Sequence, residues 1–126
     1  MKYLAIDWEH RFDNMQRHCG EHILSGKFYE LYGGVNRGFH MGEDYMTIDI
    51  SLEENPDFTK ITWEMAKAAE LETNKAIWQN LPVITRHFDS RAEAKNLPLR
   101  KALAFDEDIT IVCVGAVENP ADCVAC

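Results

Sequence analysis

The sequence is organised around Gln16-Arg17-His18-Cys19-Gly20-Glu21-His22-Ile23-Leu24-Ser25. This stretch places His18 and His22 four residues apart in a segment that is predicted to be helical. Side chains at positions i and i+4 lie one above the other on a helix face, so both imidazoles can reach one ion. Imidazole is the commonest side-chain metal ligand near neutral pH, and zinc accepts it readily. The stretch therefore predicts a helix that carries a metal site.

The predicted helix extends beyond this stretch in both directions. Asp13 or Asn14 can act as its N-cap, and Gly33-Gly34 can stop it near Leu31. Gly20 stands in its middle, where glycine costs about 1 kcal/mol relative to alanine. Two explanations are open for this glycine: close packing of the helix, or room for a substrate or a backbone segment beside the histidines.

The rest of the chain supplies a second helix and several strands. The second helix is predicted over residues 60–80, capped by Thr59, because its apolar residues recur every three or four positions. Residues 45–50 alternate between apolar and polar side chains, and residues 109–114 are mostly β-branched, so both runs are predicted strands. Further predicted elements are a strand that ends at residue 8, a turn over 38–45 and a strand over 83–88. Two long helices among strands without regular βαβ alternation predict an α+β fold, with the helices packed on an antiparallel sheet.

Length and composition indicate one globular domain over residues 1–126. Of its 126 residues, 46% are hydrophobic and 27% are charged. The formal net charge is −8, which argues against a chain that grips nucleic acid by itself, because phosphate binding usually needs a basic face. A polyanionic partner requires basic residues that are concentrated locally or supplied by another domain.

The sequence also gives expectations about location. No signal peptide is recognised at its start, and no stretch approaches the ~20 apolar residues that span a bilayer. The expected location is the cytoplasm, with no membrane partner. We therefore expect the cysteines to be reduced thiols or metal ligands rather than disulfides. They are Cys19, Cys113, Cys123 and Cys126.

Two of these cysteines add to the metal hypothesis. Cys123-Val124-Ala125-Cys126 has the C-x-x-C spacing that is common in zinc sites. One or both thiolates can complete a tetrahedral set of ligands with the two histidines. The alternative for this segment is a frayed tail with no ligand role.

The histidine pair also fits a second class of zinc enzyme. His18 to His22 matches H-x-x-E-H, the signature of inverted zinc peptidases, in which the glutamate is the general base on a zinc-bound water. That function requires a carboxylate ligand further along the chain. Glu93 is a candidate, but nothing around it singles it out, and the chain is short for such a fold.

Glu21 is the candidate catalytic residue, because its role differs between an inverted zinc peptidase and other zinc enzymes. It lies about 60° from His18 around the helix and about 100° from His22, so its carboxylate can border the metal without ligating it. There it can hold a water or contact a substrate amino group. The alternative is a partly exposed glutamate that pairs with Arg17 or Ser25, worth about 0.3–0.5 kcal/mol.

Several ordered segments carry a resemblance that covers almost the whole chain. Ile6-Asp7-Trp8-Glu9-His10-Arg11-Phe12-Asp13-Asn14-Met15 is similar to the lead-in I-D-W-x-x-R-x-x-x-M, and His18 to His22 matches H-x-x-x-H. Further matches are 38–42, 47–50, 72–74, 80–83 and 97–101, and Cys126 falls where a C-x-x-x-H motif begins. Together they resemble the editing domain of alanyl-tRNA synthetases, and more closely the free-standing alanyl-tRNA editing proteins (AlaX-like).

The resemblance implies zinc-dependent hydrolysis of tRNA(Ala) that carries a wrong amino acid, typically serine or glycine. It implies His18, His22 and Cys126 as metal ligands, with Cys123 as the alternative thiolate. The residues expected to contact the substrate are Gln16, Cys19, Thr47 and Asp49. A third hypothesis is a non-catalytic binding module of the same fold.

Some features depart from the family pattern. A zinc-binding histidine is expected just after Cys126, and a glycine-rich G-G-G-Q-P segment is expected before Met1. Neither is present, so we expect a domain truncated at both ends, with flanking domains supplying much of the tRNA binding. Cys19 stands where the family often has Ser or Thr, and Glu21 where close relatives often have Gln.

Overall fold

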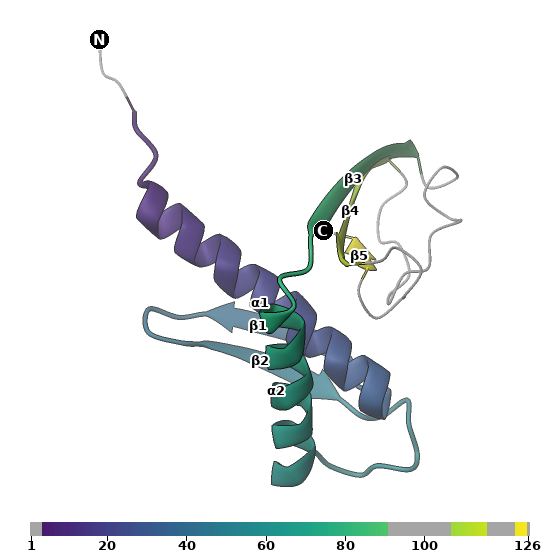
Figure 1. Ribbon diagram of the computed structural model, residues 1–126. Helices are drawn as coiled ribbons and strands as arrows, with labels where there is room; N and C mark the ends of the chain where they lie inside the picture. Colours follow the sequence, from purple (N-terminus) through teal and green to yellow (C-terminus); the bar gives the residue numbers. More distant parts are fainter. Residues whose placement is uncertain (1–3, 91–106, 116–122, 126) are drawn as a thin grey trace.

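The computed structural model describes residues 4–90, 107–115 and 123–125 of the chain. Its elements in chain order are α1 (Trp8–Tyr32), β1 (Val35–Met41), β2 (Met46–Ser51), α2 (Trp63–Trp78), β3 (Val83–Ser90), β4 (Glu107–Val114) and β5 (Cys123–Ala125). All strand pairs are antiparallel, and they form a β1–β2 sheet and a β3–β4–β5 sheet. The predicted α+β fold with two helices is confirmed, and its strands are divided between two sheets (Figure 1).

The first helix begins earlier than the sequence predicts. Asp7 is its N-cap and accepts a hydrogen bond from the backbone N–H of His10. The prediction of a strand end at Trp8 and a helix start near Asp13 is therefore wrong. The misleading signal is the apolar side chain of Trp8, which is 61% exposed on the first helical turn instead of being buried in a sheet. The other end is as predicted, because Gly33 caps the helix in the left-handed conformation with φ of 67°.

The β1–β2 hairpin lies along α1 and is fastened to it at the hairpin turn. The predicted turn over 38–45 is shorter in the structure, since β1 continues to Met41. Arg17 of α1 donates hydrogen bonds to the carbonyl oxygens of Gly42 (2.6 Å) and Glu43 (2.9 Å). Its guanidinium also pairs with Asp13 at 3.0 Å. These contacts attach the hairpin turn to Arg17, the residue directly before His18.

Replacing Gly42 by alanine is expected to lower the free energy of unfolding by about 1–3 kcal/mol. A Cβ atom at Gly42 would lie 2.6 Å from the backbone oxygen of Tyr45, which accepts the turn hydrogen bond from Gly42. Urea unfolding of the variant measures the loss. Gly38→Ala is the matched control, because its Cβ would meet only Asp49 Oδ2 at an ordinary 3.7 Å. Equal losses in the two variants would contradict the steric explanation.

The second helix packs against α1 and leads into the C-terminal sheet. It begins after the N-cap Thr62 instead of the predicted Thr59. Its buried face consists of Met65, Ala69, Thr73 and Ala76.

In the β3–β4–β5 sheet the strands predicted over 83–88 and 109–114 are confirmed, and Ile111 and Cys113 are fully buried. In Figure 1, β5 lies on one side of the middle of α1. Within the described ranges, no helix is both long enough and apolar enough to cross a membrane.

Candidate metal centre

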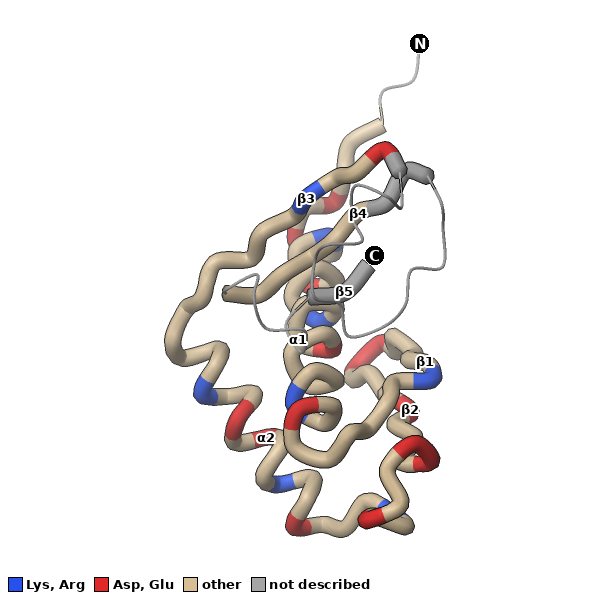
Figure 2. The backbone as a smooth tube through the Cα atoms, turned by 90° about the vertical axis from the view of Figure 1, so that its right-hand side faces the viewer, with Lys and Arg blue, Asp and Glu red and all other residues tan. Residues whose placement is uncertain are grey.

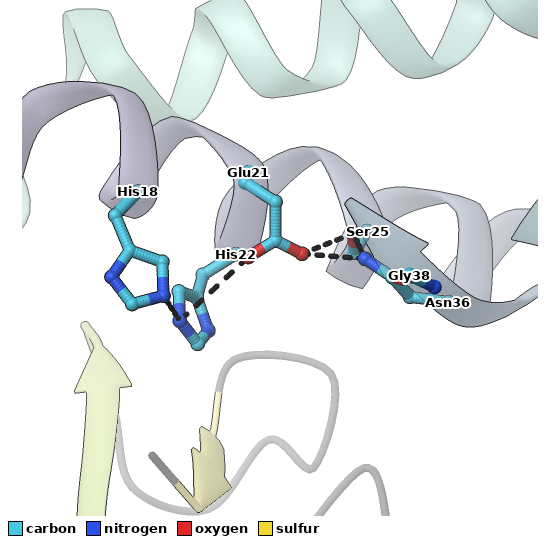
Figure 3. A network of polar contacts seen from close by, with 6 residues as sticks. All are labelled: His18, Glu21, His22, Ser25, Asn36 and Gly38. Atoms are coloured by element: carbon cyan, nitrogen blue, oxygen red, sulfur yellow. Dashed lines mark hydrogen bonds and ion pairs between the residues drawn. The ribbon is translucent and has the colours of Figure 1, made fainter. Parts of the chain in front are cut away.

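His18 and His22 converge on one point beside the middle of α1. Their Nε2 atoms lie 3.0 Å apart, and both side chains are partly buried (Figure 3). The ring of His18 stacks on that of Phe39 from β1, with centroids 5.5 Å apart. The helix supplies the four-residue spacing, and the hairpin supplies the aromatic ring that holds His18 in place. Figure 3 shows both imidazoles directed toward the side of α1 on which β4 and β5 lie.

The separation of the two nitrogens suits a zinc ion. Zinc binds imidazole nitrogen at about 2.0–2.1 Å, so two such ligands at a tetrahedral angle have nitrogens about 3.3 Å apart. The observed 3.0 Å between the Nε2 atoms of His18 and His22 is within a few tenths of an ångström of this value. The spacing is therefore compatible with both imidazoles as ligands of one zinc ion.

Glu21 completes a group of three possible ligands, but one of its two carboxylate oxygens is already hydrogen-bonded to neighbouring side chains. One ligand atom each of His18, Glu21 and His22 lie within 4.8 Å of one another. Oε1 of Glu21 accepts hydrogen bonds from Ser25 Oγ (2.8 Å) and Asn36 Nδ2 (2.6 Å), while Oε2 lies 3.8 Å from His22 Nε2. The alternative left open for Glu21 was a partly exposed glutamate that pairs with Arg17 or Ser25. The structure has the contact with Ser25, but the residue is only 4% exposed.

The burial of Glu21 favours a cation at this site. The donors on its Oε1 are neutral, and His22 is the only basic group that the structure describes within 4 Å of the carboxylate. A buried carboxylate is costly unless positive charge compensates it. Two imidazoles and a carboxylate are donors that zinc accepts, so the residues present fit the ion.

Asn36 is a site residue that the sequence did not single out. It is 8% exposed on β1, and its Nδ2 lies 2.7 Å from Ser25 Oγ as well as 2.6 Å from Glu21 Oε1. Its Oδ1 accepts a 2.7 Å hydrogen bond from the backbone N–H of Gly38, across an irregularity in the β1–β2 register. The sequence pattern Asn-x-Gly indicates a local turn at Asn36. It gives no indication that Asn36 also binds Glu21, which lies 15 residues earlier.

The residues predicted to contact the substrate do not gather around the histidine pair. Gln16 and Cys19 line a hollow on a different side of α1, and burial raises the pKa of the Cys19 thiol. Thr47 and Asp49 are exposed on β2, paired in register with His40 and Gly38. The structure therefore brings together His18, Glu21 and His22, and leaves the four substrate candidates on two other surfaces.

The predicted thiolate ligands are only partly within the described residues. Cys123 is the first residue of β5, and its backbone pairs with Cys113 of β4. Cys126 lies outside the described residues, as do Glu93 and the 97–101 match. The placement of β5 near the middle of α1 brings the described end of the chain to the same side as the imidazoles (Figures 1 and 3).

Comparison with known proteins identifies the family of the chain. No protein-family model matches the chain. The chain is 40% identical over 116 residues to the alanyl-tRNA editing protein AlaX-L of Pyrococcus horikoshii, covering 91% of the chain and 27% of that relative. It is 30% identical over 119 residues to AlaX-M of Methanosarcina acetivorans, covering 90% of the chain and 45% of that relative. It is also 32% identical over 83 residues to Aarsd1 of Bos taurus, covering 66% of the chain and 17% of the relative.

The predicted resemblance is therefore confirmed. The chain is an AlaX-like sequence, homologous to one part of the alanyl-tRNA editing proteins. It spans less than half the length of each of these relatives.

Proposed function

We propose that this chain is the metal-holding part of an enzyme that hydrolyses tRNA(Ala) charged with a wrong amino acid. The observation that carries the proposal is the 3.0 Å approach of the His18 and His22 nitrogens beside the buried carboxylate of Glu21. Homology to alanyl-tRNA editing proteins supports the substrate class. Serine and glycine are the expected amino acids, since a binding pocket for alanine rejects slightly different side chains poorly and needs a second, hydrolytic site.

The proposed zinc ligands are His18, His22 and Cys126, with Cys123 as the alternative thiolate. A zinc ion in such a site supplies Lewis-acid chemistry that polarises an ester or activates water. The protein's own contribution is to hold the two imidazoles: α1 sets their spacing and Phe39 packs against His18. Ser25 and Asn36 fix Glu21, so its Oε2 faces the imidazoles in one orientation.

The charge of the chain bears on how the tRNA is bound. Figure 2 shows acidic and basic residues interspersed along both helices. The net charge of −8 opposes tight binding of the tRNA body to this chain alone. Flanking domains are therefore proposed to supply most of the affinity for tRNA, and cytoplasmic tRNA is the proposed pool of substrate.

A deacylation assay tests the proposed function. Full-length protein is incubated with seryl-tRNA(Ala), glycyl-tRNA(Ala) and correctly charged alanyl-tRNA(Ala), and the remaining ester is measured over time. We expect loss of the seryl or glycyl ester while the alanyl ester survives. Equal stability of all three esters would leave a non-catalytic binding module, and cleavage of a generic peptide instead would support the inverted peptidase.

Replacing Glu21 by glutamine separates the editing and peptidase functions. Glutamine keeps an oxygen that can accept from Ser25 and Asn36 but cannot act as a general base. We expect deacylation by Glu21→Gln to stay within about threefold of the wild type, with zinc retained. A loss of about 10²–10⁴-fold with zinc retained would identify Glu21 as a general base and contradict this expectation.

A further inference from the structure

Two cysteines are direct partners across the C-terminal sheet. Cys113 of β4 is paired with Cys123 of β5, and the register is continuous over the two neighbouring pairs of this antiparallel ladder. Directly opposed residues of an antiparallel pair lie on the same face of the sheet, with Cα atoms about 4.5 or 5.5 Å apart. A disulfide requires Cα atoms about 4.4–6.8 Å apart. The backbone register therefore meets the distance requirement for a disulfide.

Cys113 is a buried free thiol in the central strand of this sheet. Its side chain is fully buried, and its backbone is paired with Ile84 of β3 on the side away from β5. Among the described residues, Cys113 is not in the group of possible metal ligands formed by His18, Glu21 and His22. A buried thiol packs as a small apolar side chain. Packing therefore accounts for the burial of Cys113, but not for the second cysteine opposite it.

The other cysteines suit Cys123 less well as disulfide partners. Cys19 lies on α1, outside the β4–β5 ladder. Cys126 shares the C-x-x-C motif with Cys123, but residues three apart along an extended strand are about 10 Å from each other, which is too far for a disulfide. Because β5 is extended from Cys123 to Ala125, a link within this motif requires the strand to unfold. A link to Cys113 keeps the strand and its pairing.

We propose that Cys113 and Cys123 form a site of reversible oxidation, at which a peroxide joins them in a disulfide that holds β5 on β4. The proposal is independent of the proposed function. Strand β5 has three residues and lies at the edge of its sheet. A short edge strand opens locally at low free energy, which gives the oxidant access to the two thiols. A sulfur in a disulfide is not a thiolate ligand, so oxidation withdraws Cys123 from any role at the metal centre.

The reaction balances with hydrogen peroxide as the oxidant. The thiolate of Cys123 attacks one peroxide oxygen, the O–O bond breaks and a first water leaves, so that Cys123 becomes a sulfenic acid. The thiolate of Cys113 then attacks this sulfur, the S–O bond breaks and a second water leaves. The two sulfurs give two electrons to the peroxide, and the two thiol protons end in the two waters. In a reducing compartment such disulfides are transient and act as redox sensors.

Peptide mapping of the oxidised full-length protein tests the assignment of the two cysteines. The protein is treated with hydrogen peroxide, alkylated in denaturant and digested without reductant, and the peptides are identified by mass spectrometry. We expect a peptide that links Cys113 to Cys123 to be the main disulfide product, and we expect dithiothreitol to restore both thiols. A link between Cys123 and Cys126, or a Cys113 thiol that remains free for alkylation after oxidation, would overturn the proposal.

Thermal unfolding tests whether the disulfide holds β5 on the sheet. Oxidation is expected to raise the melting temperature of the wild type by at least about 5 °C, because the cross-link lowers the entropy of the unfolded chain. Cys123→Ser is expected to abolish this shift, and it is preferred to Cys113→Ser, which places a hydroxyl in the core.

Cys19→Ser is the matched control, because Cys19 lies outside the β4–β5 ladder, and it is expected to keep the full shift. An equal shift in Cys123→Ser and the wild type would overturn the proposal. Neither peptide mapping nor thermal unfolding uses tRNA or measures deacylation, so failure of this inference is distinguishable from failure of the proposed function.

Discussion

The double replacement His18→Ala/His22→Ala is expected to abolish zinc binding and to lower hydrolysis of seryl-tRNA(Ala) at least a thousandfold. Both effects are expected because the two nitrogens, 3.0 Å apart, form the centre of the proposed ligand set. A metal supplies several kcal/mol of transition-state stabilisation, and about 4 kcal/mol corresponds to a factor of a thousand in rate. Zinc content is measured by elemental analysis of the full-length protein, and hydrolysis by the deacylation assay.

His10→Ala is the matched control for this result. His10 lies on the same helix, but it is exposed in the first turn and contacts Asn14 rather than the site. We expect normal zinc content and activity in this variant. Equal zinc content in the double variant and the wild type would contradict the metal assignment, and loss of activity with zinc retained would give the histidines a direct role in the reaction.

The second large effect is on stability. Asn36→Ala is expected to lower the free energy of unfolding by about 2–3 kcal/mol, because it removes a donor from the buried carboxylate of Glu21 and an acceptor from the N–H of Gly38. Ser25→Ala removes only one donor from Glu21 and is expected to cost about 1–1.5 kcal/mol. Urea unfolding followed by circular dichroism measures both.

A peripheral asparagine provides the comparison. Asn74 is half-buried on α2, and its side chain has no hydrogen-bond partner among the described residues. Asn74→Ala is expected to change stability by less than about 0.5 kcal/mol. A loss for Asn36→Ala no larger than that for Asn74→Ala would mean that the network around Glu21 contributes nothing measurable to folding.

The predictable parts of the fold are those encoded by local sequence. Helical spacing predicted α1 through the histidine stretch, and Gly33 marked its end because a left-handed cap favours glycine. The start of α1 was missed because Trp8, an apolar residue, is exposed on the helix. Strand β1 was missed because Arg37 and Gly38 obscure the alternation that marks β2.

The candidate site was likewise predictable only where it depends on local sequence. The pairing of His18 with His22 follows from a spacing of four residues on one helix. The environment of Glu21 does not, because its partner Asn36 comes from another element and is positioned by the hairpin register. Burial of a carboxylate depends on such long-range contacts, so no local pattern distinguishes Glu21 from an exposed helix glutamate.

The hairpin directly after α1 also has a consequence for the order of folding. Every contact described within the site lies either within α1, as between the two imidazoles, or between α1 and β1, as from Glu21 to Asn36 and from His18 to Phe39. Their separations along the chain are short, and short loops close quickly and at low entropic cost. The helix–hairpin unit can therefore form as an early cooperative unit during synthesis. The two imidazoles are then already in place when the strands of the C-terminal sheet emerge.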